Sequence, residues 1–350
     1  MTMPDSGTAL RIRALTPDRA AEWDAFVAQC PGATFFHRAG WQRVIQRSFG
    51  HKTHYLYAEQ DGAIRGVLPL THIASRLFGN ALISNAFCVY GGPAALDAAA
   101  RAALDRQAMA LMAELGADCL EYRQLERLHP DWPAKDGLYA TFRRAIAPDP
   151  EVNLKAIPRK QRAVIRQSLE RNLVLEEDGD VERFFRLYAE SVRNLGTPVF
   201  GKRYFRALKE EFGEDCEVLI VRHEGAPVCG VMSFYFRDEV LPYYAGATPA
   251  VRGLGAYDFV YWHILRKAAE RGLKIFDFGR SKQGTGAFAF KKNWGFPAQP
   301  IIHEYQLRPG AAIPDVNPLN PKYRLFIAAW KKLPLPLANF AGPLIARDLG

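Results

Sequence analysis

One order of predicted elements occurs twice in this chain. Each copy has two helices, three or four strands, a long helix and a closing strand. The long helices end at Gly116 and Gly272, and the strands that follow them span residues 119–122 and 275–278. Two copies of one supersecondary order, each with its own apolar stretches, predict an internal duplication with two hydrophobic cores.

Size and charge are consistent with two globular domains and an anionic partner. A length of 350 residues suits two domains, and 49% hydrophobic residues are enough to form a core in each. The net charge of +9 favours a phosphate-bearing substrate, RNA or a membrane surface as partner. A generally basic composition without a specific partner is the alternative interpretation.

Cysteine and histidine spacing indicates neither a disulfide framework nor a metal site. The five cysteines are scattered and never spaced as C-x-x-C, which suits a reducing compartment. His51 and His54 have the spacing of a metal pair but no third ligand follows them, so no metal is expected. The first ten residues hold no apolar signal core, and no run of 18 apolar residues occurs. We therefore expect a cytoplasmic protein.

Changes in composition divide the chain into four expected parts. The segment A-P-D-P-E at residues 147–151 is a boundary candidate. We expect a first domain over 1–148, a basic connecting helix over 149–179, a second domain over 180–308 and a Pro-rich tail over 309–350.

The connecting segment is strongly basic. Ile165 and Leu169 at helical spacing predict a helix that packs along one side. Its other side is either a solvated face or a contact surface for phosphates. Against the single acid Glu170, this helix carries the cations Lys155, Arg159, Lys160, Arg162, Arg166 and Arg171.

The stretch from 274 to 296 is predicted to present a binding loop. A short apolar strand breaks at Gly279 into a loop with Arg280, Ser281 and Lys282. An aromatic and basic segment follows, and it contains the pair Lys291 and Lys292. Cations and glycines where a strand ends are typical of an anion-binding loop, although a solvated surface turn is the alternative.

The corresponding strand of the first copy continues differently. After residues 119–122 the chain reads R-Q-L-E-R-L-H-P, without the glycines or the lysine pair. This asymmetry between the copies places the predicted chemistry in the second half of the chain.

The element order resembles the GNAT-type N-acyltransferase fold. Two such units in one chain resemble the Fem-type (FemABX) aminoacyl transferases and the related BioF2-like acetyltransferase domains. The segments D-F-G-R-S-K-Q-G-T-G and F-K-K-N-W-G and the tail N-P-K-Y-R-L-F-I-A-A-W-K-K-L-P-L-P-L are similar to FemAB-like proteins of PEP-CTERM/exosortase and exopolysaccharide systems. The resemblance implies an α+β chain of tandem GNAT-like domains, with mixed, mostly antiparallel sheets flanked by helices.

The resemblance also implies a donor loop before a helix. GNAT enzymes hold the pyrophosphate of coenzyme A on a loop R/Q-x-x-G-x-G/A, which Arg252 and Gly255 match. Tyr257 replaces the last small residue and would crowd a pyrophosphate. An aminoacyl-tRNA, the donor of Fem enzymes, is therefore an alternative to acyl-CoA, and no tightly bound cofactor is expected. Arg43 lies near the helix position where relatives contact a substrate phosphate.

Amide formation by such a fold needs an amine, an activated acyl group and stabilisation of an oxyanion. Lys291 or Lys292 is expected to hold a donor phosphate or to stabilise the developing negative charge. Asp277 is expected to orient the amine or accept its proton, or else to serve the scaffold.

Further residues are predicted to bind substrate or donor. We expect Arg280, Ser281 and Lys282 to contact anions, and Phe290 and Trp294 to pack against the acceptor or a base. Tyr244 is on a strand that faces the acyl group in GNAT enzymes, although an aromatic residue on a strand is usually a core residue.

The expected function is that of a Fem-like transferase. It attaches an acyl or aminoacyl group to an amine of a cell-envelope or exopolysaccharide precursor. The alternatives are a coenzyme-A-dependent N-acetyltransferase of an amino sugar and a non-catalytic scaffold protein of a polysaccharide system.

The tail mixes large apolar residues with lysines and arginines. It is a candidate for peripheral contact with the inner face of the membrane, or else a strap packed on the domains. Pro334 and Pro336 exclude one continuous helix there. The oligomeric state stays open.

Overall fold

The computed structural model describes residues 9–75, 78–251, 253–314 and 324–350. It divides into two compact units. Unit 1 takes in the described residues within 1–136, 302–315 and 348–350, and unit 2 those within 137–301 and 316–347. Among these residues, no helix is long and apolar enough to cross a membrane.

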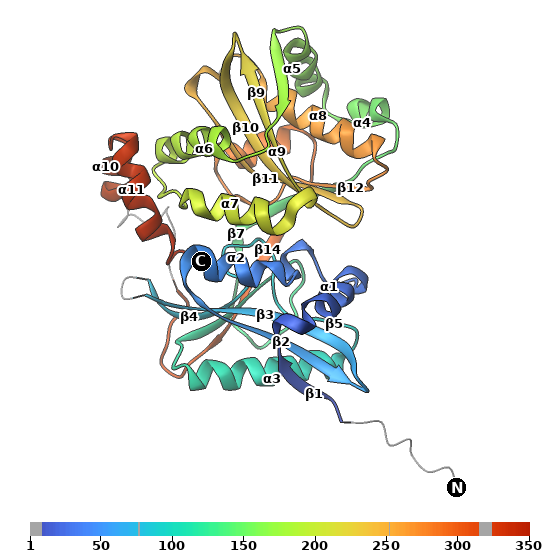
Figure 1. The fold of residues 1–350 in the computed structure, drawn as a ribbon, viewed down its shortest axis with the longest axis vertical. Helices are drawn as coiled ribbons and strands as arrows, with labels where there is room; N and C mark the ends of the chain where they lie inside the picture. Colours follow the sequence, from blue (N-terminus) through green and yellow to red (C-terminus); the bar gives the residue numbers. More distant parts are fainter. Residues whose placement is uncertain (1–8, 76–77, 252, 315–323) are drawn as a thin grey trace. The chain divides into compact units, whose positions relative to one another are not determined.

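Unit 1 contains one six-stranded main sheet with helices packed against it (Figure 1). Its strand order is β1-β2-β3-β4-β6-β14, and only the β4–β6 pair is parallel. The elements are β1 (Arg11–Ala14), α1 (Ala20–Gln29), α2 (Gly40–Phe49), β2 (Lys52–Gln60), β3 (Ala63–Ser75), β4 (Gly79–Ser84), β5 (Ala94–Ala95), α3 (Ala98–Glu114), β6 (Cys119–Gln124) and β14 (Ala298–Leu307), with 3-10 turns at Pro17–Arg19 and Phe35–His37.

Unit 2 repeats this plan. Its strand order is β8-β9-β10-β11-β12-β7, and only the β11–β12 pair is parallel. The strands are β7 (Ala134–Ala145), β8 (Leu173–Glu177), β9 (Cys216–His223), β10 (Ala226–Phe236), β11 (Glu239–Ala247), β12 (Ile275–Asp277) and β13 (Ser281–Lys282). The helices are α4 (Pro150–Ala156), α5 (Arg159–Leu169), α6 (Glu182–Leu195), α7 (Lys202–Phe212), α8 (Ala256–Glu270), α9 (Gly286–Asn293), α10 (Arg324–Trp330) and α11 (Leu335–Ala346), with 3-10 turns at Gly213–Asp215 and Pro249–Val251.

The shared plan confirms the predicted α+β class and the mostly antiparallel sheets flanked by helices. In each unit the parallel pair brackets the long helix, since β4 and β6 flank α3 in the chain and β11 and β12 flank α8. A parallel pair needs a crossover connection, and a helix supplies it.

The two repeats exchange a strand. β7 follows β6 in the chain but pairs with β12 in unit 2, whereas β14 follows the second repeat and pairs with β6 in unit 1. The sequence prediction contained neither strand, and it placed the first domain at 1–148. The compact units instead divide at 136/137.

Two predicted segments fold differently from expectation. The basic segment within 149–179 is not one helix, because Pro158 separates α4 from α5 and β8 follows them. Proline at 158 lacks the N–H that a continuous helix needs. The segment with the lysine pair is not a loop but helix α9, which begins at the capping residue Thr285. The Thr285 side chain accepts a hydrogen bond from the backbone N–H of Phe288 at 3.3 Å.

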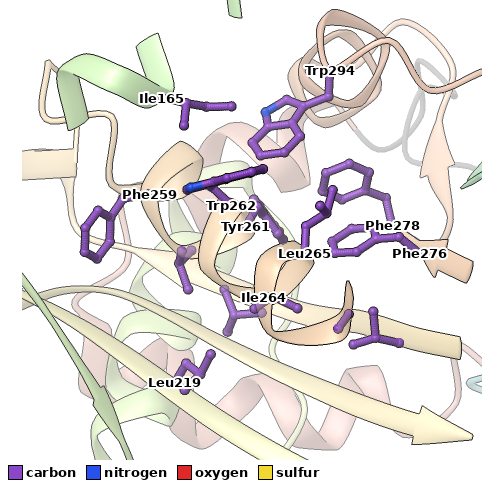
Figure 2. Close-up of a cluster of buried hydrophobic side chains, with 14 of the residues drawn as sticks. Ile165, Leu219, Phe259, Tyr261, Trp262, Ile264, Leu265, Phe276, Phe278 and Trp294 are labelled. Atoms are coloured by element: carbon purple, nitrogen blue, oxygen red, sulfur yellow. The ribbon is translucent and has the colours of Figure 1, made fainter. Parts of the chain in front are cut away.

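Helix α8 lies at the centre of the core of unit 2 (Figure 2). Ile165 of α5, Phe276 of β12 and Trp294, the residue after α9, converge on it. The opposite face of the sheet packs on α6, where the backbone of Tyr188 approaches β11 closely. A Cβ atom at Gly246 would lie 2.3 Å from Tyr188 Cα, so only glycine fits there.

A charged cluster ties β14 into unit 1. His129 lies between two carboxylates, with its Nε2 3.1 Å from Asp105 Oδ2 and its Nδ1 3.3 Å from Glu304 Oε2. Its ring stacks on Trp132 at 4.0 Å. Burial lowers the pKa of His129, but the hydrogen bonds and charges of Asp105 and Glu304 outweigh it and raise the pKa to about 9.

We predict that His129→Gln destabilises the protein by about 1–3 kcal/mol near pH 6.5. Because folding raises the pKa of His129, its contribution is fully present below pH 6.5 and is lost as the pH rises through 9. The difference between wild type and variant in thermal unfolding should therefore shrink towards pH 10. An equal difference at both pH values would contradict the charged cluster.

Candidate active site

Strand β12 ends in a turn that the buried carboxylate of Asp277 stabilises. Asp277 Oδ1 accepts hydrogen bonds from the backbone N–H of Gly279 at 2.7 Å and from Thr141 Oγ1 at 3.0 Å. Gly279 has φ of +68°, a conformation that glycine adopts without strain. Since Asp277 is only 1% exposed, its carboxylate serves this turn from within the core.

Lys291 extends from α9 onto this turn. Its Nζ donates to the carbonyl oxygens of Gly279 at 3.0 Å and Arg280 at 3.2 Å, and it lies 5.9 Å from the centroid of the Phe142 ring. Burial lowers the pKa of Lys291 to about 7, while the charge of Asp277 raises it and that of Arg280 lowers it. An ammonium group with two of its three N–H groups engaged keeps one donor for a ligand.

Other donors lie in the same turn. The Arg280 guanidinium lies over the ring of Tyr139, 4.8 Å from its centroid. Ser281 is buried, and its hydroxyl has no hydrogen-bond partner among the described residues. Lys282 pairs with Tyr139 in the β13–β7 ladder and is half-buried. The structure thus brings Asp277, Arg280, Ser281, Lys282 and Lys291 together.

The lysine pair is divided by the helix. Adjacent residues on a helix point about 100° apart, so Lys291 faces the turn while Lys292 is exposed to solvent. The two lysines therefore do not form one cationic site. Of the two lysines, only Lys291 contacts this turn.

Two predicted aromatic contacts are core residues instead. Trp294 is fully buried, and its Nε1 donates to Asp258 Oδ1 at 2.9 Å, so no substrate can pack against its ring. Tyr244 is buried, and its hydroxyl lies 2.8 Å from the hydroxyl of Tyr204. Both rings take part in packing because their polar atoms find partners inside unit 2.

A cavity of ≈ 360 Å³ lies where α5, the start of α8 and α9 meet. Gly255 is the residue before α8, with φ of +66°, and no side chain caps the helix. The first N–H groups of a helix attract anions when no side chain satisfies them. Val164, Gln167, Arg171, Val251, Gly253, Leu254, Gly255, Ala256, Tyr257, Asp258 and Phe290 line this cavity.

Tyr257 forms a wall of the cavity. Its ring stacks on Tyr261 with the ring centroids 6.2 Å apart, and its centroid lies 6.2 Å from that of Phe290. The side chain therefore fills space beside the start of α8 that a small residue would leave open. Asp258 places a carboxylate in the first turn of α8, where burial raises its pKa. Its Oδ1 accepts hydrogen bonds from Gln161 of α5 and from Trp294, the residue after α9, and these bonds connect α5 and the end of α9 to α8.

The consecutive residues Phe290 and Lys291 connect the cavity with the turn after β12. Phe290 lines the cavity, and Lys291 contacts the turn after β12. Arg252 lies outside the described residues, and Arg43 is an exposed residue of α2 in unit 1. Within the described ranges, no group of three or more His, Cys, Asp or Glu side chains is placed to bind a metal.

Comparison with known proteins identifies the domain. Residues 155–292 match the family model of the acetyltransferase (GNAT) domain, a span that holds both the cavity and Lys291. No curated protein matches the chain. Residues 155–292 are a GNAT-type acetyltransferase domain. The class of enzyme is therefore an acyltransferase, with its donor open.

Solved structures show that the tandem GNAT fold covers nearly the whole chain. A structure of FemX matches with a TM-score of 0.67 and 15% identity over 91% of this chain and 100% of that one. The C-terminal domain of a putative lysylphosphatidylglycerol synthetase from Agrobacterium fabrum matches with a TM-score of 0.56 and 15% identity, over 84% and 93% of the two chains. A tandem GNAT protein of the clavulanic acid pathway matches with a TM-score of 0.51 and 15% identity, over 88% and 100%.

Three residues of the candidate site were not expected from the sequence. Thr141 lies on β7, a strand that was not predicted although residues 138–146 are rich in β-forming side chains. Gln161 and Asp258 join α5 to α8. An acid in the first turn of a predicted helix was a visible signal for Asp258, whereas no local pattern indicates its partners.

The contacts of Asp277 predict different effects for two substitutions. Asp277→Ala removes an acceptor from two donors and should destabilise the protein by about 1–3 kcal/mol, because the buried N–H of Gly279 loses its partner. Asp277→Asn keeps an oxygen in place and should lose less stability. Chemical denaturation of both variants measures the difference.

The same pair of variants distinguishes a structural role of Asp277 in the turn from a role as proton acceptor. If Asp277 serves the turn, acyl transfer should follow stability, with Asp277→Asn retaining more activity than Asp277→Ala. Equal and complete loss of transfer in both variants, with Asp277→Asn fully stable, would show that Asp277 accepts a proton.

Proposed function

We propose that unit 2 transfers an acyl or aminoacyl group to an amine of a cell-envelope or exopolysaccharide precursor. The observation that carries the proposal is the Lys291 amine, whose pKa is lowered to about 7 and which is held at the strand end by two carbonyl oxygens. The proposal places the enzyme in the cytoplasm, at the inner face of the membrane, where the five free cysteines stay reduced.

In the proposed reaction the acceptor amine attacks the carbonyl carbon of the donor ester or thioester. A C–N bond forms, and the carbonyl oxygen becomes an oxyanion. When the C–O or C–S bond breaks, the amine loses a proton and the leaving oxygen or sulfur gains one. The remaining N–H of Lys291 donates to the oxyanion, with Arg280 as a further donor in the turn.

Basic residues beside the cavity favour a large anionic donor such as aminoacyl-tRNA. Arg171 lines the cavity, and Arg159, Lys160 and Arg166 are exposed on α5. These four cations make no ion pair among the described residues. A row of unpaired cations attracts a phosphate backbone. One structural neighbour is named a putative lysylphosphatidylglycerol synthetase, which supports an aminoacyl group as the group transferred.

The second candidate is a coenzyme-A-dependent N-acetyltransferase of an amino sugar. The uncapped start of α8 at Gly255 and the match to an acetyltransferase domain favour it. Tyr257 and the Asp258 carboxylate at the same helix start weigh against a bound pyrophosphate. A scaffold protein without turnover is the third candidate.

Donor assays separate these candidates. The purified full chain is incubated with labelled acyl-CoA or with aminoacyl-tRNA, and an extract of envelope precursors supplies the acceptor. We expect product from aminoacyl-tRNA that RNase abolishes. Product from acyl-CoA alone would support the second candidate, and no product from either donor would support the scaffold.

Lys291→Met should lower acyl transfer at least a hundredfold, which corresponds to about 2.7 kcal/mol of lost transition-state stabilisation. In the wild type, transfer should fall as the pH rises through about 7, because Lys291 then loses the proton that stabilises the oxyanion. A rate that instead rises through pH 7 and vanishes in Lys291→Met would make Lys291 a general base. Lys52→Met, which removes an exposed lysine of unit 1, is the matched control.

Lys291→Met should also raise thermal stability at pH 6. Folding lowers the pKa of Lys291, so the unfolded chain binds more protons between about pH 7 and 10.5, and the stability of the wild type rises with pH in that window. The gain from Met should therefore be largest below pH 7 and shrink towards pH 10.5. A melting temperature that falls at pH 6 would contradict a desolvated amine at this position.

A further inference from the structure

The last two helices present an apolar face to solvent. Figure 1 shows α10 and α11 as a hairpin in red, and α11 packs on α6 of unit 2. Eleven large hydrophobic side chains are exposed in the described part of the chain, and five of them belong to this hairpin. We call these five the tail face: Leu325, Phe326, Leu337, Phe340 and Leu344.

Helix α11 buries small residues and exposes large ones. Ala338, Gly342 and Ala346 recur every four residues and are buried. A Cβ atom at Gly342 would lie 2.9 Å from the backbone nitrogen of Val199, so this side of the helix sits directly against the backbone of unit 2. Large residues lie on the outer side, with Phe340 76% and Leu344 63% exposed.

This arrangement is the reverse of an ordinary surface helix, which turns its large apolar residues to the core. An apolar patch of this kind marks an interaction surface. The small-residue side is already occupied by unit 2, so the tail face is available to a further partner.

Charge indicates what the partner is. Residues 324–347 contain no aspartate or glutamate, while Lys331 and Lys332 are exposed in the turn between the two helices. Neither lysine makes an ion pair among the described residues. In a twofold dimer built on this face, each copy would present the same unpaired cations to the other, and like charges repel. An anionic surface matches both the lysines and the apolar side chains.

Length limits how the hairpin can meet a bilayer. Helix α11 has 12 residues, about 18 Å at 1.5 Å per residue, against a hydrocarbon core of about 30 Å. The hairpin is therefore too short to span and has the size of an interfacial segment, with apolar residues at the acyl boundary and lysines at the headgroups.

We propose that the tail face docks on the surface of a bilayer that contains anionic lipids. Leu337, Phe340 and Leu344 insert at the boundary of the acyl chains, and Lys331 and Lys332 contact the lipid phosphates. This inference rests on α10 and α11 alone and does not depend on the proposed transfer reaction.

Vesicle flotation with the full chain tests the proposal. The probes are vesicles of phosphatidylcholine and vesicles with 30 mol% phosphatidylglycerol. We expect binding to the anionic vesicles and at least a tenfold smaller bound fraction for Leu337→Ser/Phe340→Ser/Leu344→Ser. Leu96→Ser/Val174→Ser is the matched control, because both residues are exposed hydrophobics outside the hairpin, and it should bind as wild type does.

Charge is tested separately. Lys331→Gln/Lys332→Gln should weaken binding to the anionic vesicles and reduce its dependence on salt. Arg159→Gln/Lys160→Gln removes the same charge from α5 and should have a smaller effect. Equal effects of the two pairs would show that net charge alone drives binding, and would overturn the role of the hairpin.

Two further results would also overturn the proposal. One is wild-type protein that does not float with anionic vesicles. The other is self-association in sedimentation equilibrium that the triple serine variant abolishes, without vesicle binding by either protein, which would make the tail face a dimer interface. Thermal unfolding checks that the variants fold, and Phe340→Ser replaces the triple variant if that one does not.

Discussion

One buried carboxylate holds together the helices that make the candidate site. Asp258 in the first turn of α8 accepts hydrogen bonds from Gln161 of α5 and from Trp294 after α9. Burial raises its pKa, and the two donors oppose this by stabilising the charged form. Through Trp294, the same contact fixes α9, and α9 carries both Phe290 and Lys291. The geometry of the cavity and of the turn after β12 therefore depends on this contact.

The proposed reaction uses two places in unit 2, one for the donor and one for the developing negative charge. The cavity at the start of α8 offers N–H groups and Arg171, which attract an anion, while its Tyr257 and Asp258 side chains weigh against a bound pyrophosphate. The turn after β12 offers Lys291 and Arg280, which suit a developing negative charge. Helix α9 joins them through consecutive residues. A loop with these residues would be mobile, whereas a helix capped by Thr285 and closed by the buried Trp294 keeps them in place.

Local patterns in the sequence were enough for the repeated fold, whereas the place of the chemistry stays a prediction. The helix-ending glycines, the hairpin turns and the loop after residue 278 all have short-range signals, and the GNAT match agrees with them. The strand exchange has no short-range signal in the sequence, because β7 and β14 pair with strands far away in the chain. Likewise, nothing local shows that Lys291 faces inward, Lys292 outward and Trp294 into the core. Those directions follow from the phase of α9, which tertiary packing sets.

The ionisation of Lys291 is the most direct test of this account. A titration of lysine amines by NMR, with ¹³C-labelled lysine in wild type and in Lys291→Arg, reports each amine separately. One lysine resonance of the wild type should titrate near pH 7 and be missing from Lys291→Arg. If every lysine in the wild type titrates near its ordinary value above pH 10, the amine is not desolvated and the proposed role of Lys291 fails.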